Sequence, residues 1–346
     1  MKMGEETVSK KVSVVFLLQN VADKNDISTD MKTAYQCCVD QDISPDWITN
    51  EECFKMKPKK TDIFVIEEFK GKAFSFLKDF KIISPRCLMT CLMERRPIPN
   101  IPSPLFTIAM VDIIVTASGF SKDQKKTLGD KIGLMGGIYL NPFNASVTHL
   151  IANAVGSQKY KVAAERGIPI MSEDWVNAVW EAGLKENVNA SDPQFASYKL
   201  PAFKGLLICA SQISKAEKQK VMKVITENGG RYSPQLECKE TNVLVIGDPS
   251  GTKYIFAKKW DIPCVTPQWV FDSASHGYSL PFDGYIPGEE VEAKCSTPKL
   301  GGNPGVLPDF SMCSTIVGEQ THLHVNDTIS SEISAIPEQH TPKKKN

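Results

Sequence analysis

The sequence predicts an α/β protein in which a domain with a parallel sheet occurs more than once. Residues 147–180 have the order strand, loop, helix, strand, helix and contain no hairpin signals. Strands that alternate with helices in this way favour a parallel sheet. The same order of elements recurs over residues 241–277, where Lys253 repeats Lys159. A repeat of this length indicates tandem domains of one kind.

The elements of the clearest copy follow from its local sequence. The run from Val147 to Ile151 is apolar and rich in β-branched residues, as in a buried strand. Gly156 and Ser157 interrupt this pattern, and serine is a favoured helix N-cap. The predicted elements are a strand over 147–151, a helix over 158–166, a strand over 168–171 and a final helix capped by residues 172–174.

The other copies show the same alternation. The second copy begins upstream with a strand over 111–116 and a helix over 122–135, and the third with a strand over 203–209 and a helix over 215–228. A degraded first copy is predicted as strands over 14–18 and 61–66 and helices over 29–38, 71–80 and 86–95. This copy lacks a Gly-Gly pair, and Cys87 stands about where the others have tryptophan.

Composition shifts divide the chain between these copies. The proline-rich run PIPNIPSP cannot continue a helix and marks a short connector, and residues 184–200 are polar and turn-rich. The predicted divisions are a polar lead-in over 1–12, a divergent domain over 13–100, a domain over 101–190, a domain over 199–290 and a disordered tail over 291–346.

The totals restrict the classes of protein. The 346 residues carry 40 basic and 40 acidic side chains, so the formal net charge is zero. Binding of duplex DNA as the main ligand is therefore disfavoured, because nonspecific DNA binding needs a clearly basic surface. The N-terminus has no signal-peptide pattern, and no apolar run reaches the roughly 20 residues of a membrane span. We therefore expect an intracellular protein in a reducing compartment.

The ten cysteines contain no C-x-x-C pair. Cys87, Cys91, Cys209 and Cys264 lie in apolar strand or helix contexts, where a free cysteine behaves as a small hydrophobe. No histidine lies near Cys87 and Cys91 to complete a zinc set. The cysteines are therefore predicted to be buried free thiols, with no bound metal.

The motifs together resemble the BRCT repeat. They are a Gly-Gly pair after the first helix, a THLI-type strand, the pattern G-S-x-K-Y at the start of the second helix and a central tryptophan in the third. The resemblance covers roughly residues 13–290 and is specific for the second and third copies. It implies three tandem BRCT-type domains, each a four-stranded parallel sheet flanked by helices.

The resemblance also implies a function. BRCT proteins of this arrangement are nuclear, non-enzymatic scaffolds of DNA replication initiation and the DNA-damage checkpoint, and they need no cofactor. They bind phosphorylated tails of partners, such as a checkpoint clamp subunit and the treslin-like replication factor. We expect a monomer in this region.

The second copy carries a predicted phosphate pocket. Ser118 and Gly119 end the first strand; Ser118 offers a hydroxyl donor, and Gly119 lets the backbone turn towards an anion. Lys125 on the first helix and Lys159 at the start of the second supply positive charge, which a phosphate group needs. Ser118, Lys125 and Lys159 match phosphate-binding positions of the BRCT family, although the loop after Ser118 is one residue longer than usual.

The third copy carries a similar set with one departure. Ser211 takes the hydroxyl position, and Lys218 and Lys253 supply the charges. Gln212 replaces the glycine, and its side chain is expected to restrict the backbone N–H or to reshape the pocket. The first copy has Gln19 and Asn20 after its first strand and Ala73 near the lysine position, beside Lys72. It is therefore assigned a packing role.

Several repeated residues are predicted to be structural. A tryptophan flanked by apolar residues in the third helix packs against the sheet, and paired glycines permit a tight turn from helix to strand. His149 lies on a predicted buried strand and is expected to be a core histidine rather than a base. The structural set is Trp175, Trp269, Gly136, Gly137, Gly229 and Gly230.

The sequence leaves three other functions to consider. An enzyme is disfavoured because the chain has no G-x-G-x-x-G after a strand, and the GDPSGTK segment that ends at Lys253 has the wrong spacing for a P-loop. A binder of DNA ends or nicked DNA could use the same pockets for a terminal phosphate, with strong salt dependence. A purely structural interaction module with vestigial pockets is the third alternative.

Overall fold

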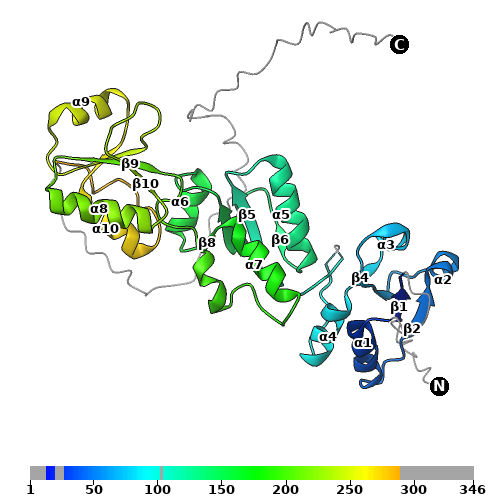
Figure 1. Ribbon diagram of the computed structural model, residues 1–346. Coiled ribbons are helices and arrows are strands. Elements are labelled where there is room, and N and C mark those ends of the chain that lie inside the picture. Colours follow the sequence, from blue (N-terminus) through cyan, green and yellow to red (C-terminus); the bar gives the residue numbers. More distant parts are fainter. Residues whose placement is uncertain (1–12, 20–26, 102–103, 289–346) are drawn as a thin grey trace, which may run out of the picture. The chain divides into compact units, whose positions relative to one another are not determined.

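The structure, a computed structural model, describes residues 13–19, 27–101 and 104–288. The strands form three separate four-stranded sheets, which Figure 1 shows in blue to cyan, in green, and in yellow-green to orange. Every strand pair in these sheets is parallel. The predicted fold of three tandem α/β domains is confirmed. The predicted lead-in of residues 1–12 and tail of residues 291–346 lie outside the described residues.

The three units share one order of elements, to which the first unit adds a short helix after its second strand. The first unit contains β1 (Val14–Leu18), α1 (Thr29–Val39), β2 (Asp46–Thr49), α2 (Asn50–Lys55), β3 (Ile63–Val65), α3 (Gly71–Leu77), β4 (Lys81–Ile83) and α4 (Pro85–Met93). The second contains β5 (Ile114–Ser118), α5 (Lys122–Leu134), β6 (Ile138–Tyr139), β7 (His149–Ala152), α6 (Gln158–Glu165), β8 (Ile170–Met171) and α7 (Glu173–Gly183). The third contains β9 (Leu207–Ser211), α8 (Lys215–Glu227), β10 (Arg231–Ser233), β11 (Val243–Ile246), α9 (Gly251–Lys259), β12 (Cys264–Val265) and α10 (Pro267–His276).

The sheets share one topology. Their strand orders are β2-β1-β3-β4, β6-β5-β7-β8 and β10-β9-β11-β12, so the first strand of each unit lies between the second and the third. The chain therefore leaves the first strand towards one edge and the third strand towards the other. This reversal places a crevice at the carboxyl ends of the two central strands, where α/β sheets commonly bind ligands.

Helices cover both faces of each sheet, and alternate strand residues supply the two cores. In the second unit Ile151 packs in the cluster with α5 and α7, whereas Leu150 and Ala152 pack in the cluster with α6. The first and third units are divided in the same way, with α1 and α4 opposite α2 and α3, and α8 and α10 opposite α9. Since both faces are buried, the central strands are largely apolar, whereas the edge strands β2 and β10 carry polar residues.

The two repeated tryptophans are core residues, as predicted. Trp175 and Trp269 are both 0% exposed. Each indole also donates a hydrogen bond to a backbone carbonyl, at 3.0 Å from Trp175 Nε1 to Ala190 O and at 2.9 Å from Trp269 Nε1 to Leu280 O. Burial of the ring together with a satisfied N–H fixes α7 and α10 against their sheets.

The two positions of each glycine pair require glycine for different reasons. The first glycine of each pair, Gly136 or Gly229, has a φ of +83° or +77°, the left-handed region in which side chains are strained. The second lies where the chain is too crowded for a side chain. A Cβ at Gly137 would be 2.7 Å from Ile132 Cγ2. The predicted structural role of both pairs is confirmed.

Some predicted elements were misplaced. The first strands of the second and third units begin later than predicted, at Ile114 and Leu207 rather than at residues 111 and 203. The strand β2 and the short helix α2 of the first unit were not predicted. Residues 184–200 are more than a connector, because they contain a 3₁₀ helix (Pro193–Tyr198) whose Phe195 lies in the core of the second unit. Ser172 is the N-cap residue of α7, but its side chain makes no capping hydrogen bond.

The described cysteines are all free thiols, and most are buried as predicted. Cys238 is exposed and Cys37 is half-buried, so the prediction is wrong for these two. Within the described ranges, no group of three or more metal-ligating side chains could hold a metal ion. In the same ranges, the structure contains no helix of the length and apolarity needed to cross a membrane.

Candidate phosphate-binding sites

The candidate site of the second unit lies at the carboxyl ends of β5 and β7. Ser118 is the last residue of β5, and Ser157 is the N-cap of α6, which follows β7. The Ser118 hydroxyl donates a hydrogen bond to Ser157 Oγ at 2.8 Å. The two serines therefore place a pair of hydroxyl groups in the crevice where the strand order reverses.

The backbone turns sharply after Ser118. Gly119 has a φ of +83°, and the side-chain amide of Asn153 donates a hydrogen bond to its carbonyl oxygen. Asn153 also fills the space where a Cβ at Gly119 would lie. This close approach requires glycine, as predicted, and it ties the end of β5 to the segment after β7.

Lys159 lies in the first helical turn of α6, and its side chain reaches back to the end of β5. Its ammonium group donates hydrogen bonds to Thr116 Oγ1 at 2.8 Å, to the carbonyl oxygen of Ala117 at 3.1 Å and to that of Asn141. Partial burial lowers the pKa of Lys159, and the nearby charge of Lys125 lowers it further. The charges of the two predicted lysines are thus close enough to influence each other.

Two cations held close together without a counterion favour the binding of an anion. Within the described residues, neither Lys125 nor Lys159 forms a salt bridge with a carboxylate. A groove of about 880 Å³ continues from this point along α5 and β6, and Lys125, Tyr139 and Asn141 are among its lining residues. The groove has room for peptide residues on one side of a bound phosphate.

The third unit arranges its predicted residues differently. Ser211 ends β9, and the ammonium group of Lys253 donates to the carbonyl oxygen of Pro234 and lies 3.5 Å from Cys209 Sγ. Gln212 has a φ of +50°, so it adopts the left-handed backbone that Gly119 has in the second unit. A Cβ at Gly251 would lie 2.5 Å from Gln212 Nε2. The glutamine side chain therefore occupies space at the start of α9.

Lys218 lies on α8, at the position of Lys125 in the repeat. The phosphate-binding role of the third set therefore rests on the repeat more than on geometry.

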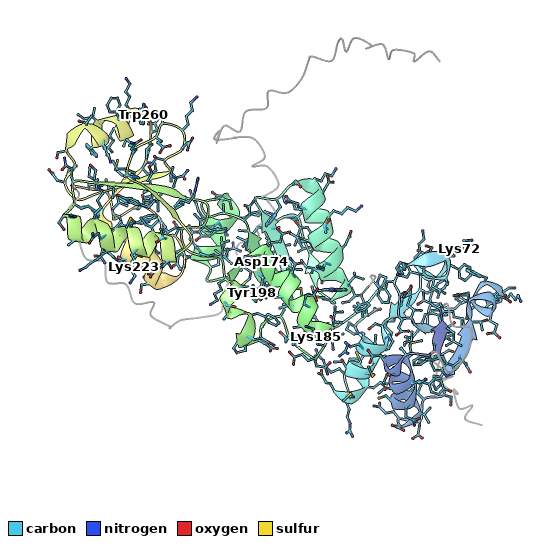
Figure 2. All side chains as sticks on the ribbon, in the orientation of Figure 1. Lys72, Asp174, Lys185, Tyr198, Lys223 and Trp260 are labelled. Carbon is cyan, nitrogen blue, oxygen red and sulfur yellow. The ribbon has the colours of Figure 1, made fainter. Side chains whose placement is uncertain are left out.

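The first unit lacks these groups. The side chain of Gln19 donates to the carbonyl oxygen of Glu68 at 2.9 Å and accepts from its N–H at 2.9 Å, which ties the end of β1 to the segment after β3. Ala73 is buried at the lysine position, and Lys72 projects from α3 into solvent (Figure 2). Asn20 lies outside the described residues. The packing role of this unit remains a prediction.

The sequence pattern did not identify three of the residues that shape the second site, which are Thr116, Asn141 and Asn153. Thr116 could have been found, because it lies two residues before Ser118 on the same strand and therefore on the same face. Asn141 and Asn153 lie in loops, where spacing gives no such signal. Ser157 was predicted only as a helix cap.

His149 begins β7 and is half-buried. Its ring stacks on Trp175 with a centroid distance of 4.9 Å, and its Nδ1 lies 3.0 Å from Thr148 Oγ1. Burial lowers the pKa of His149 to about 4. The side chain is therefore a neutral packing residue, as predicted.

This lowered pKa predicts a pH dependence of stability. The unfolded chain protonates His149 near its ordinary pKa of about 6.5, whereas the folded chain resists protonation until about pH 4. The stabilisation is thus present above about pH 6.5 and is lost as the pH falls towards 4. Between pH 7 and pH 5 we expect a loss on the order of 2 kcal/mol. Urea denaturation of the wild type and of His149→Gln at both pH values measures this loss of unfolding free energy. An equal loss in the two proteins would contradict its assignment to His149.

The comparisons with known proteins agree with this fold. Residues 113–175 and 206–269 match the twin BRCT domain family. Protein ECT2 of Homo sapiens is 27% identical over 215 residues, which cover 59% of this chain and 24% of that protein. The S-M checkpoint control protein rad4 of Schizosaccharomyces pombe is 27% identical over 162 residues, which cover 46% of this chain and 25% of that protein. The chain thus spans about a quarter of the length of these relatives.

A crystal structure of Rad4 BRCT1,2 in complex with a Crb2 phosphopeptide is 25% identical and covers 52% of this chain and 100% of that chain, with a TM-score of 0.48. Residues 113–175 and 206–269, which match the family model, are BRCT domains, and the chain is a BRCT-repeat protein. BRCT domains are protein-interaction modules. In particular, the chain resembles the N-terminal triple-BRCT region of topoisomerase-II-binding protein, above all in the segment SVTHLIANAVGSQKYKVAAERGIPI.

Proposed function

We propose that the chain is a non-enzymatic scaffold that binds Ser/Thr-phosphorylated tails of partner proteins through its second and third BRCT units. The observation that carries this proposal is the geometry around Lys159. Its ammonium group bonds Thr116 near the end of β5, where two serine hydroxyls and a glycine turn lie at one crevice, and it lies within electrostatic range of Lys125. These are the groups that hold the oxygens of a phosphate monoester.

The strength of such a site can be bounded. A hydrogen bond to a charged group contributes about 1.5–3 kcal/mol. Two or three of them, with contacts of flanking residues in the adjoining groove, reach about −8 kcal/mol, which corresponds to a micromolar dissociation constant. Affinity of this order suits reversible recognition of a phosphorylated tail.

The cellular setting is also part of this proposal. The rad4 protein is named as a checkpoint control protein. We place this chain in the nucleus, in the DNA-damage checkpoint and in the initiation of DNA replication. Its proposed partners are the phosphorylated tails of a checkpoint clamp subunit and of a treslin-like replication factor, bound by a monomeric triple-BRCT region.

Fluorescence anisotropy tests the proposal directly. The full chain is titrated into an acidic peptide with one phosphoserine or phosphothreonine, into its unphosphorylated twin and into a duplex with a 5′-phosphate. We expect micromolar binding of the phosphopeptide and at least about tenfold weaker binding of the twin. Equal binding of both peptides would indicate a structural module. Tighter binding of the duplex, with a steep salt dependence, would indicate a DNA-end binder.

A further inference from the structure

The segment that joins β7 to α6 supplies part of the second unit's site. We call residues 153–157 the β7–α6 loop. Its first residue, Asn153, bonds the carbonyl of Gly119, and its last residue, Ser157, accepts the hydrogen bond of Ser118. The conformation of this loop therefore determines where the hydroxyl pair lies and where α6, with Lys159, begins.

The loop is held from outside its own unit. The backbone N–H of Val155 donates to the carbonyl oxygen of Lys204 at 3.0 Å, and Lys204 belongs to the segment that leads into β9 of the third unit. The next residue, Gly205, has a φ of +86°, and a Cβ placed there would lie 2.7 Å from the Cβ of Ala154. The contact is so close that only glycine fits without displacing the loop.

A second contact from the third unit reaches the start of α6. Tyr160 follows Lys159 and is 2% exposed. Its phenolic oxygen accepts a hydrogen bond of 2.8 Å from the backbone N–H of Ser279, which follows α10. Val155, which precedes Ser157, and Tyr160, which follows Lys159, are thus both held by residues of the third unit. In the part of the chain that the structure describes, no such bond from another unit reaches Tyr254, the repeat of Tyr160.

We propose that the third BRCT unit positions the phosphate site of the second, with Gly205 and Tyr160 as positioning residues. This inference rests on the proposed function of the second unit and adds that its site is completed by its neighbour. It follows that the two pockets are unequal. A disturbance at the contact weakens the second pocket and leaves the third unchanged.

Gly205→Ala is the variant that tests this inference. The added methyl group displaces Ala154, and with it the loop. Gly284→Ala is the matched control, since Gly284 also lies in the third unit with a φ of +82° but has nothing within 4 Å of the added Cβ. The two variants share the backbone strain and differ in the contact. Ala154→Gly combined with Gly205→Ala removes the clash and is expected to restore the site.

Two readouts are needed in the full chain. Phosphopeptide affinity of the second pocket is measured in a Lys253→Glu background, and that of the third in a Lys159→Glu background. Gly205→Ala is expected to weaken the second pocket roughly three- to tenfold and to leave the third unchanged. Amide hydrogen exchange without peptide is expected to become faster from Val155 to Lys159 in Gly205→Ala alone.

The outcomes separate the two proposals. If the wild type binds the phosphopeptide and Gly205→Ala behaves like Gly284→Ala in both readouts, the positioning inference is wrong and the proposed function stands. If the wild type fails to bind the phosphopeptide, the proposed function is wrong, and hydrogen exchange alone decides whether the third unit holds the loop. Loss of both pockets in Gly205→Ala would indicate general unfolding and would also overturn the inference.

Discussion

Lys159→Glu is expected to weaken phosphopeptide binding at the second unit by about 100-fold or more. The change removes a cation that would make charge-assisted hydrogen bonds of about 1.5–3 kcal/mol with phosphate oxygens. It also places a carboxylate where the phosphate would lie, next to the hydroxyls of Ser118 and Ser157. Repulsion between the two anions adds to the lost attraction.

The control for this variant comes from the same helix. Lys161→Glu changes the net charge of α6 by the same amount, but Lys161 is exposed and belongs to no predicted pocket. Circular dichroism checks the fold, because Lys159 also satisfies Thr116 Oγ1 and the carbonyl of Asn141. If Lys161→Glu and Lys159→Glu weaken binding equally, the interaction is general electrostatic attraction and the pocket assignment fails.

Lys253→Glu distinguishes the two pockets. Anisotropy with the wild type, each single variant and the double variant assigns a given phosphopeptide to one unit. A peptide whose binding is lost only in Lys253→Glu is bound by the third unit, despite Gln212 at the turn. If binding survives in the double variant, neither Lys159 nor Lys253 binds the phosphate group.

Trp175→Ala is expected to destabilise the second unit by about 3–5 kcal/mol. The change empties a site in the core between the sheet and α7, leaves the carbonyl of Ala190 without its indole partner and removes the ring on which His149 stacks. Each of these losses acts on the same unit. The free energy of unfolding of a typical domain is only about 5–15 kcal/mol, so a large share of its stability is lost.

Urea denaturation measures this loss, and Trp260→Ala is its control. Trp260 lies at the end of α9 (Figure 2) and is half-buried against Phe256, with ring centroids 5.2 Å apart. Its removal is expected to cost about 1 kcal/mol, since less surface returns to water. An equal cost for the two tryptophans would show that Trp175 does not anchor the core.

Much of the fold follows from patterns that are local in sequence. The strands of the second and third units are short apolar runs, except for the edge strand β10, and each helix begins after a residue such as Ser121, Ser157 or Ser214 that can cap it. These signals act within a few residues, so they can be recognised without knowing the fold. The repeat of lysine, tryptophan and paired glycines then shows that one domain occurs again.

The elements that were missed lack such signals. Strand β2 in the first unit reads Asp46-Trp47-Ile48-Thr49 and is only partly buried, because it lies at the edge of its sheet. The polar segment over 184–200 resembles a connector, yet Ala190 and Phe195 pack in the core beside Trp175. Their burial depends on partners far away in the sequence, which local periodicity does not reveal.

The sequence by itself determined the class of this protein, a chain of tandem parallel α/β domains of the BRCT kind, and the residue types of its candidate pockets. Only the tertiary structure decided that Lys125 lies near Lys159, that Ser157 pairs with Ser118, and that the third unit contacts the loop between β7 and α6. The physical reason is that hydrogen bonds and close contacts of this kind join residues from different elements. Their formation depends on how the sheets and helices pack, and packing is a property of the folded chain as a whole.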